Sequence, residues 1–219
     1  MGTFNIGTWT TNTMDVTLTK PYDAEVKWLE STGSQYIDTG VSAYNAVVGT
    51  EIKFQSTTTQ HDKWVFGIFN GSLGNSYNYL IGSYGGWNVF LGSAGQLKPG
   101  YSVDTNEHIV RINIDGKTQF DNVVLLNSPT SMTYTGDFSS SLWVFMTHRT
   151  GNGGPYNNYY MTSKVFYCKI YRDGVLVRDF IPVRFTNELN QSEGAMYDKV
   201  SGQLFRNQGT GSFLWEDKQ

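Results

Sequence analysis

Acidic residues could carry out glycoside hydrolysis, which needs two carboxyl groups that flank the bond to be cleaved. The nearest approach to such a pair is Asp23 and Glu25, with Glu30 beyond them. On a regular strand Asp23 and Glu25 share a face, whereas Glu25 and Glu30 have the wrong parity to do so. We therefore expect these acids to be charges on a solvated edge, and we expect no enzymatic activity.

Other catalytic patterns are missing from the sequence. The histidines His61, His108 and His148 are isolated, and none has a second histidine at metal-ligand spacing. No Gly-x-Ser-x-Gly elbow and no phosphate-binding glycine loop is present. Neither a zinc site nor a serine nucleophile is expected.

The single cysteine, Cys168, excludes an intrachain disulfide. Alternation along residues 165–171 places Cys168 on one face with Phe166 and Ile170. A free cysteine in such a setting behaves as a small apolar residue. We expect a buried thiol with a packing role.

Tyrosine and asparagine gather in two glycine-rich stretches, and this combination suits sugar recognition. Rings stack on the apolar faces of sugars, while amides and hydroxyls share hydrogen bonds with sugar hydroxyl groups. In residues 149–160 the candidate ligand contacts are Arg149, Asn152, Tyr156, Asn157, Tyr159 and Tyr160. In residues 76–88 they are Tyr77, Tyr84 and Trp87.

Both stretches also have a structural interpretation. Trp87 alternates with Val89 and Leu91, as a core residue of a strand does. Residues 149–160 equally fit a solvated or packed connection. Three further aromatic residues are expected in the core: Trp64, Trp143 and Phe145.

The elements that must position these residues are strands. Residues 48–54 alternate between buried and polar types, which is typical of a half-buried antiparallel strand. Residues 110–114 do the same and run into Asp115-Gly116, a hairpin signal, before a strand predicted over 120–126. Asp173-Gly174 marks a second hairpin, between strands predicted over 165–171 and 175–183.

Two runs, 64–69 and 142–147, are apolar on both faces and predict central strands. Pro182 is expected to end its strand or to lie at an edge, because it cannot donate to the ladder. Strands that recur between turn clusters over almost the whole chain predict an all-β fold, a two-sheet antiparallel β-sandwich.

Composition excludes several functions. The net charge is −3 and the basic residues are scattered, which argues against nucleic acid and against a polybasic membrane contact. No apolar run approaches the roughly 20 residues of a membrane span. The first residues lack the basic and apolar regions of a signal peptide.

Residues 1–22 differ from the rest, being threonine-rich and nearly uncharged. We interpret them as an N-terminal arm or an edge strand that could dock the domain onto other virion or surface proteins. Residues 23–219 form the domain itself.

Four segments carry a family resemblance: 28–41 (WLESTGSQYIDTGV), 169–183, 194–200 and 204–213 (LFRNQGTGSF). They resemble laminin-G-like, concanavalin A-like jelly-roll domains of gut-bacterial surface proteins and their phages. The resemblance implies two stacked antiparallel sheets with close chain ends. Within it, Asp38-Thr39-Gly40 and Tyr197-Asp198-Lys199 are expected to tie turns.

Relatives of this kind often hold calcium with loop aspartates and backbone carbonyls, which suit a hard cation. Asp121 and Asp137 are the candidates here, although no Asp-x-Asp spacing supports them. No other cofactor is expected.

Together these features favour a non-catalytic recognition or adhesion module that binds surface glycan, displayed on a virion or on an extracellular surface. The alternative is a structural phage protein, such as a capsid decoration, fibre or tail component, whose jelly roll mediates protein–protein assembly. A glycoside hydrolase is the third hypothesis. An oligomer is compatible with the first two.

Overall fold

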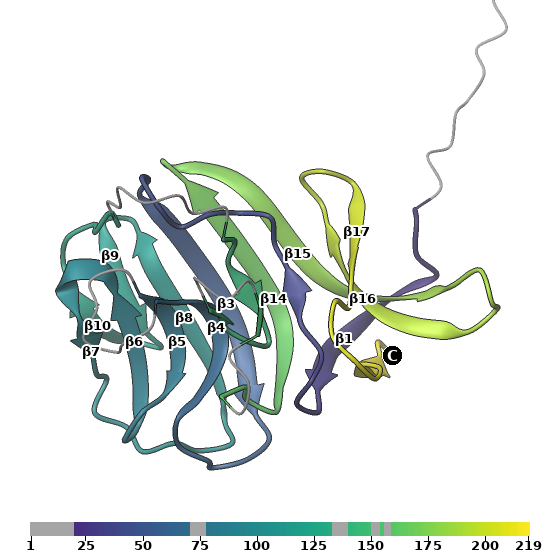
Figure 1. Ribbon diagram of the computed structural model, residues 1–219, viewed down its shortest axis with the longest axis horizontal. Helices are drawn as coiled ribbons and strands as arrows, with labels where there is room; N and C mark the ends of the chain where they lie inside the picture. Colours follow the sequence, from purple (N-terminus) through teal and green to yellow (C-terminus); the bar gives the residue numbers. More distant parts are fainter. Residues whose placement is uncertain (1–19, 71–77, 133–139, 150–153, 156–158) are drawn as a thin grey trace, which may run out of the picture.

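The computed structural model describes residues 20–70, 78–132, 140–149, 154–155 and 159–219. In these ranges the chain forms two β-sheets that pack face to face (Figure 1). Strands pair antiparallel, except that β12 runs parallel to β4. The predicted all-β sandwich is confirmed. Across the described ranges, no helix is long and apolar enough to cross a membrane.

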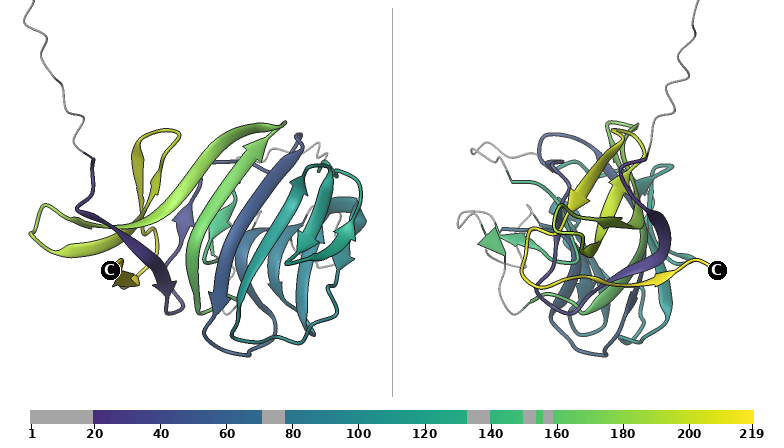
Figure 2. Two further views of the ribbon diagram at one scale, coloured as in Figure 1. Left: turned by 180° about the vertical axis from the view of Figure 1, so that it is seen from behind. Right: turned by 90° about the vertical axis from the view of Figure 1, so that its right-hand side faces the viewer.

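The larger sheet has ten strands in the described part, in the order β10-β9-β8-β3-β14-β1-β15-β16-β17, with β18 beside β1. They are β1 (Ala24–Ser31), β3 (Val48–Ser56), β8 (Glu107–Ile114), β9 (Lys117–Phe120), β10 (Val123–Leu126), β14 (Ser163–Arg172), β15 (Val175–Thr186), β16 (Ser192–Asp198), β17 (Gln203–Arg206) and β18 (Leu214–Asp217). The last three lie at the end of the molecule away from β9 and β10 (Figures 1 and 2).

The smaller sheet has eight strands over the same residues, in the order β13-β12-β4-β5-β6-β7, with β11 pairing both β4 and β2. They are β2 (Ile37–Asp38), β4 (Lys63–Phe69), β5 (Tyr79–Ser83), β6 (Trp87–Leu91), β7 (Gln96–Leu97), β11 (Trp143–Val144), β12 (His148–Arg149) and β13 (Gly154–Pro155). A 3-10 turn, Gly92–Ala94, follows β6.

The core between the sheets confirms most of the predicted patterns. Val48, Thr50, Ile52 and Phe54 are buried on β3. Strand β4 is central and buried from Trp64 to Phe69. The three aromatic residues predicted in the core are all buried, but only Phe145 belongs to the main core cluster, and Trp64 packs in a separate, smaller cluster: Trp64, Trp143 and Phe145.

Both predicted hairpins are present, with Asp115 (φ 49°) and Asp173 (φ 50°) in the left-handed region. The turn-tying aspartates are confirmed too. Asp38 accepts a hydrogen bond from the Gly40 N–H at 2.9 Å. Asp198 accepts backbone hydrogen bonds from two residues that follow it.

The environment of Cys168 is apolar, as expected. Its thiol is buried in the core, and burial raises its pKa. Phe166, however, does not share its face. A β-bulge between Val165 and Tyr167 shifts the register, so that Val165 points into the core and Phe166 lies outside, under the Lys53 ammonium group.

Pro182 was expected at a strand end or edge, and this is wrong. It lies inside β15 and faces Met196 of β16. On β15, pairing with β14 ends at Phe180 and pairing with β1 begins at Val183. Pro182 lies between the residues of β15 that pair with β14 and those that pair with β1. Its missing N–H therefore removes no hydrogen bond from either of these two pairings.

Two predicted strands are shorter than expected. The strand predicted over 120–126 breaks at Asp121, which has a φ of 51° and turns the chain from β9 into β10. The run 142–147 forms a strand only at Trp143–Val144, because Phe145 takes a φ of 72°. A left-handed residue ends regular pairing in each case.

Candidate functional site

Two segments that carry the family resemblance meet in the structure, although about 170 residues separate them. The first, residues 31–36, folds around the amide of Gln35, which is 2% exposed. The Gln35 Oε1 accepts hydrogen bonds from Ser31 Oγ at 3.1 Å and from the Thr32 N–H at 2.9 Å. The turn is therefore held by its own buried side chain.

The second segment, residues 207–211, docks on this turn. Ser34 Oγ donates to the Thr210 carbonyl at 2.9 Å, and the Gln208 N–H donates to the Tyr36 carbonyl at 2.9 Å. A Cβ atom at Gly209 would lie 1.8 Å from the Ser34 carbonyl oxygen. Glycine is needed here because the two backbones touch.

A cleft of about 430 Å³ opens beside this junction, and we call it the tyrosine cleft. Its lining combines rings, a thioether, hydroxyls and an amide over open glycine backbone: Tyr36, Tyr160, Met146, Ser34, Thr210, Gln208, Gly33 and Gly209. This is the mixture of apolar platform and hydrogen-bonding groups that sugar recognition uses.

Both tyrosine rings are fixed by their neighbours. The Tyr160 ring lies against Gly33, where an added Cβ would be 2.5 Å from its Cε2 atom. The Lys63 ammonium group lies 5.6 Å from the centre of the same ring. Tyr36 stacks on Trp143 with ring centres 4.0 Å apart, and Trp143 stacks on His148 at 4.3 Å.

His148 lies at the end of this stack opposite Tyr36. Its Nδ1 lies 3.2 Å from the Ser141 carbonyl oxygen, so the neutral ring carries its proton on Nδ1 and donates it there. Burial holds the pKa of His148 below its ordinary value, against the opposing effects of the Ser141 carbonyl and Asp38. At the outer end, burial and the charge of Asp38 raise the pKa of Tyr36.

A second, smaller depression of about 200 Å³ lies at the β5–β6 hairpin, and we call it the tryptophan hollow. Its lining is His61, Gly85, Gly86, Trp87, Lys98, Gly100, Tyr101 and Ser102. Trp87 is only 1% exposed, whereas Tyr101 is 40% exposed. Trp87 thus belongs to the core and also borders the hollow.

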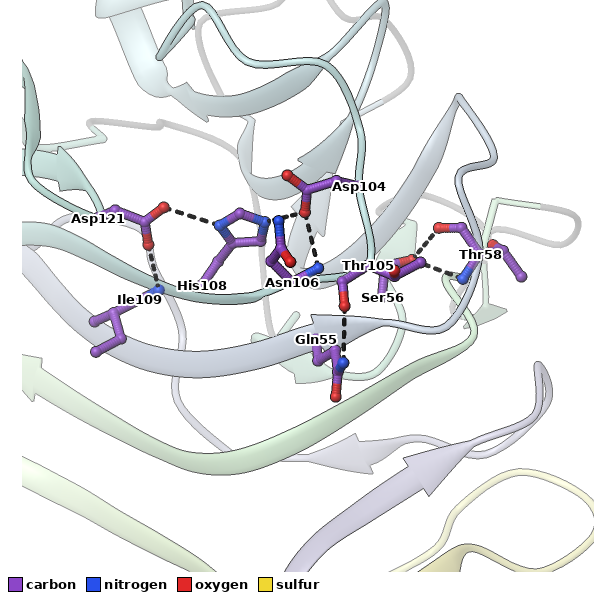
Figure 3. Close-up of polar contacts among 9 residues, drawn as sticks. All are labelled: Gln55, Ser56, Thr58, Asp104, Thr105, Asn106, His108, Ile109 and Asp121. Atoms are coloured by element: carbon purple, nitrogen blue, oxygen red, sulfur yellow. Dashed lines mark hydrogen bonds and ion pairs between the residues drawn. The ribbon is translucent and has the colours of Figure 1, made fainter.

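The Trp87 ring packs edge-on against the His108 ring, with ring centres 5.0 Å apart. The imidazole lies between two carboxylates, with Nδ1 2.9 Å from Asp121 and Nε2 2.8 Å from Asp104 (Figure 3). Burial alone raises the pKa of Asp104, but hydrogen bonds from the Asn106 backbone N–H and from His108 outweigh it and hold that pKa below its ordinary value.

Asp121, a calcium candidate, uses both carboxylate oxygens within the fold. One accepts the Ile109 N–H at 2.8 Å and the other faces His108 (Figure 3). Asp137, the other candidate, lies outside the described residues. Within the described ranges, no group of three or more acidic, histidine or cysteine side chains is placed to hold a metal ion.

The candidate ligand residues divide between the two ends of β4. Tyr160 lies beside Trp64, and across the sheet Lys63 pairs with Ser83 and Ser83 with Trp87. The Lys63 end therefore gathers four of the candidates: Tyr159, Tyr160, Tyr84 and Trp87. Arg149 pairs with Phe69 at the opposite end. Four others lie outside the described residues: Tyr77, Asn152, Tyr156 and Asn157.

Of the gathered candidates, Tyr160 lines the tyrosine cleft and Trp87 the tryptophan hollow. Tyr84 and Tyr159 are partly exposed but line neither. Sequence reasoning missed Tyr36, Ser34 and Gln208 as binding residues. They lie in the segments that carry the resemblance, and only the tertiary contact between those segments turns them toward one cleft.

Comparison with known proteins found no match to a family model, to a curated protein or to a solved structure.

Proposed function

We propose that the protein is a non-catalytic recognition module that binds glycan in the tyrosine cleft and is displayed on a virion or cell surface. One observation carries the proposal: Tyr36 and Tyr160 border the same cleft as Ser34, Thr210 and Gln208. The rings can stack on the apolar face of a sugar while the polar groups bind its hydroxyls.

Preorganisation supports this assignment. Tyr36 is stacked on Trp143, and Tyr160 lies on Gly33, so little side-chain freedom remains to be lost on binding. The side chains that line the cleft are uncharged. Stacking and hydrogen bonding are within their chemistry, whereas glycoside hydrolysis relies on a pair of carboxyl groups.

The proposal includes a laminin-G-like, concanavalin A-like identity for the domain. Two resembling segments, 28–41 and 204–213, contribute to the tyrosine cleft. A two-sheet sandwich is compatible with that family, but such folds host many functions. The assignment of glycan binding therefore rests on the cleft.

A glycan array on the purified protein, with and without calcium, tests the proposal. Tyr160→Ala should weaken binding about tenfold, since one aromatic contact contributes up to about 1.5 kcal/mol. Tyr160→Phe should bind nearly as well as the wild type, because it keeps the ring. Tyr22→Ala is the matched control: Tyr22 is also half-buried but lines neither depression.

Equal binding by the wild type and Tyr160→Ala would contradict the tyrosine cleft as the site. An array without any signal would contradict glycan binding itself and would favour the assembly role.

A further inference from the structure

The tryptophan hollow holds one ammonium group, that of Lys98, and one imidazole, that of His61, that the fold does not use. Lys98 and His61 both line it and are exposed. Neither makes a hydrogen bond, ion pair or ring contact within the described part of the chain. By contrast, basic residues such as Arg111 and Lys199 are paired with acids.

The rest of the hollow leaves room above its backbone. Gly85 and Gly100 have φ values of +65° and +87°, and an added Cβ at either would meet nothing within 4 Å. Tyr101 provides an exposed ring beside this space, and Ser102 provides a hydroxyl. The hollow therefore offers an ammonium group, a hydroxyl and an aromatic ring around uncovered glycine backbone. This combination suits a ligand that carries both an anionic group and an apolar face.

We infer that the tryptophan hollow binds the carboxylate-bearing residue of an acidic oligosaccharide, with Lys98 and His61 facing the carboxylate and Tyr101 facing the sugar ring. The inference rests on the proposed function and specifies its ligand: one acidic chain that reaches from the tyrosine cleft to the tryptophan hollow.

The spacing of the two depressions supports a single extended ligand. Tyr160 lies beside β4, and β5 and β6 follow in order, with Trp87 on β6. Three strand spacings separate the Tyr160 and Trp87 backbones by about 14 Å, so a ligand that contacts both depressions needs several linked sugar residues. Lys63 pairs with Ser83 of β5, and its ammonium group lies over the Tyr160 ring.

The test measures affinity for carboxylated polysaccharides, each beside its own carboxyl-reduced form: hyaluronan, alginate, polygalacturonate and polysialic acid. Lys98→Met removes the charge and keeps the length of the side chain. Lys117→Met is the matched control, since Lys117 is also exposed and lies on β9 of the larger sheet, away from both depressions.

We expect at least one acidic polymer to bind more tightly than its reduced form. Lys98→Met should weaken that binding about fivefold, as an exposed ion pair allows, and should leave the reduced form unaffected. Lys117→Met should change neither.

Equal affinity for acidic and reduced polymers, or an unchanged affinity in Lys98→Met, would overturn the inference. If Tyr160→Ala still weakened binding about tenfold in that case, the proposed function would stand without its acidic specificity. Absence of binding to every polymer, together with a blank glycan array, would overturn both.

Discussion

Gly209 sets the distance between the two segments that frame the tyrosine cleft. Its Cα rests against the Ser34 carbonyl, and a Cβ would lie 1.8 Å from that oxygen. Gly209→Ala should lower the free energy of unfolding by about 2–3 kcal/mol, in the range of overpacked sites, because backbone must move. It should also weaken the proposed glycan binding, since the cleft widens.

Gly116→Ala is the control for this change in urea unfolding. Gly116 has a φ of +73° with open space around it, so alanine meets conformational strain but no clash. Gly116→Ala should lower the free energy of unfolding by about 1 kcal/mol. If Gly209→Ala lowered the free energy of unfolding no more than Gly116→Ala does, residues 207–211 would be able to shift away from the Ser34 carbonyl at little energetic cost.

His148 should make stability depend on pH. Its folded pKa lies below the ordinary 6.5, so the unfolded chain takes up the proton first as the pH falls. Stability is then undiminished above about pH 6.5 and decreases as the pH falls from there toward the folded pKa.

His148→Gln should flatten this part of the profile, measured as the thermal midpoint between about pH 4.5 and 7.5, which spans the ordinary histidine pKa. The slope is compared rather than the absolute stability, because glutamine also removes a stacked ring. An unchanged slope would mean that another group controls the transition.

The turn between strands β9 and β10 depends on Asp121. It combines a left-handed backbone with hydrogen bonds to Ile109 N–H and His108. Asp121→Ala should lose about 2–3 kcal/mol of stability, the range for hydrogen bonds to charged groups. Asp121→Asn should lose less, because asparagine tolerates this backbone and keeps an acceptor.

Urea unfolding of the two variants measures the difference. Equal losses would show that the carboxylate charge, rather than the turn, matters.

The elements that could be predicted from the sequence are those specified locally. Alternation along 48–54 reflects one buried face, and Asp-Gly pairs favour the left-handed turns that hairpins need. The bulge at Phe166 and the place of Pro182 depend on which strand lies alongside, and no local pattern reports that. Both predictions failed for this reason.

The residues of the candidate site could also be predicted only where a local sequence signal exists. Residue types suggested Tyr160 and Trp87, because tyrosine, tryptophan and glycine together are a composition signal. Tyr36 and Gln208 face one cleft only because Ser34 and Thr210 bond across the fold. Trp87 remained undecided from sequence because it is both buried and at the border of a depression.

The C-terminal segment that borders the tyrosine cleft, residues 204–213, is also anchored in the core. Phe213 is 1% exposed and packs on Phe145, the residue that follows β11, with ring centres 4.7 Å apart. Phe213→Ala should cost about 3–5 kcal/mol, as deletion of a buried ring does.

Leu214→Ala is the adjacent control, because Leu214 is 51% exposed and should change stability by less than about 0.5 kcal/mol. Calorimetry of both variants checks this. Similar midpoints would mean that residues 204–213 dock on the surface without support from the core.

The pairing of β1 with β18 has a practical consequence. Val26, the third residue of β1, and Asp217, the last residue of β18, are cross-strand partners and lie about 5 Å apart, one strand spacing. Ala24 lies only two residues further along β1, so residues 24–217 could be inserted into a loop of another protein with a small spread of its ends. The module is thus suited to grafting: its position on a carrier can be chosen freely, and several copies can be arrayed along one scaffold.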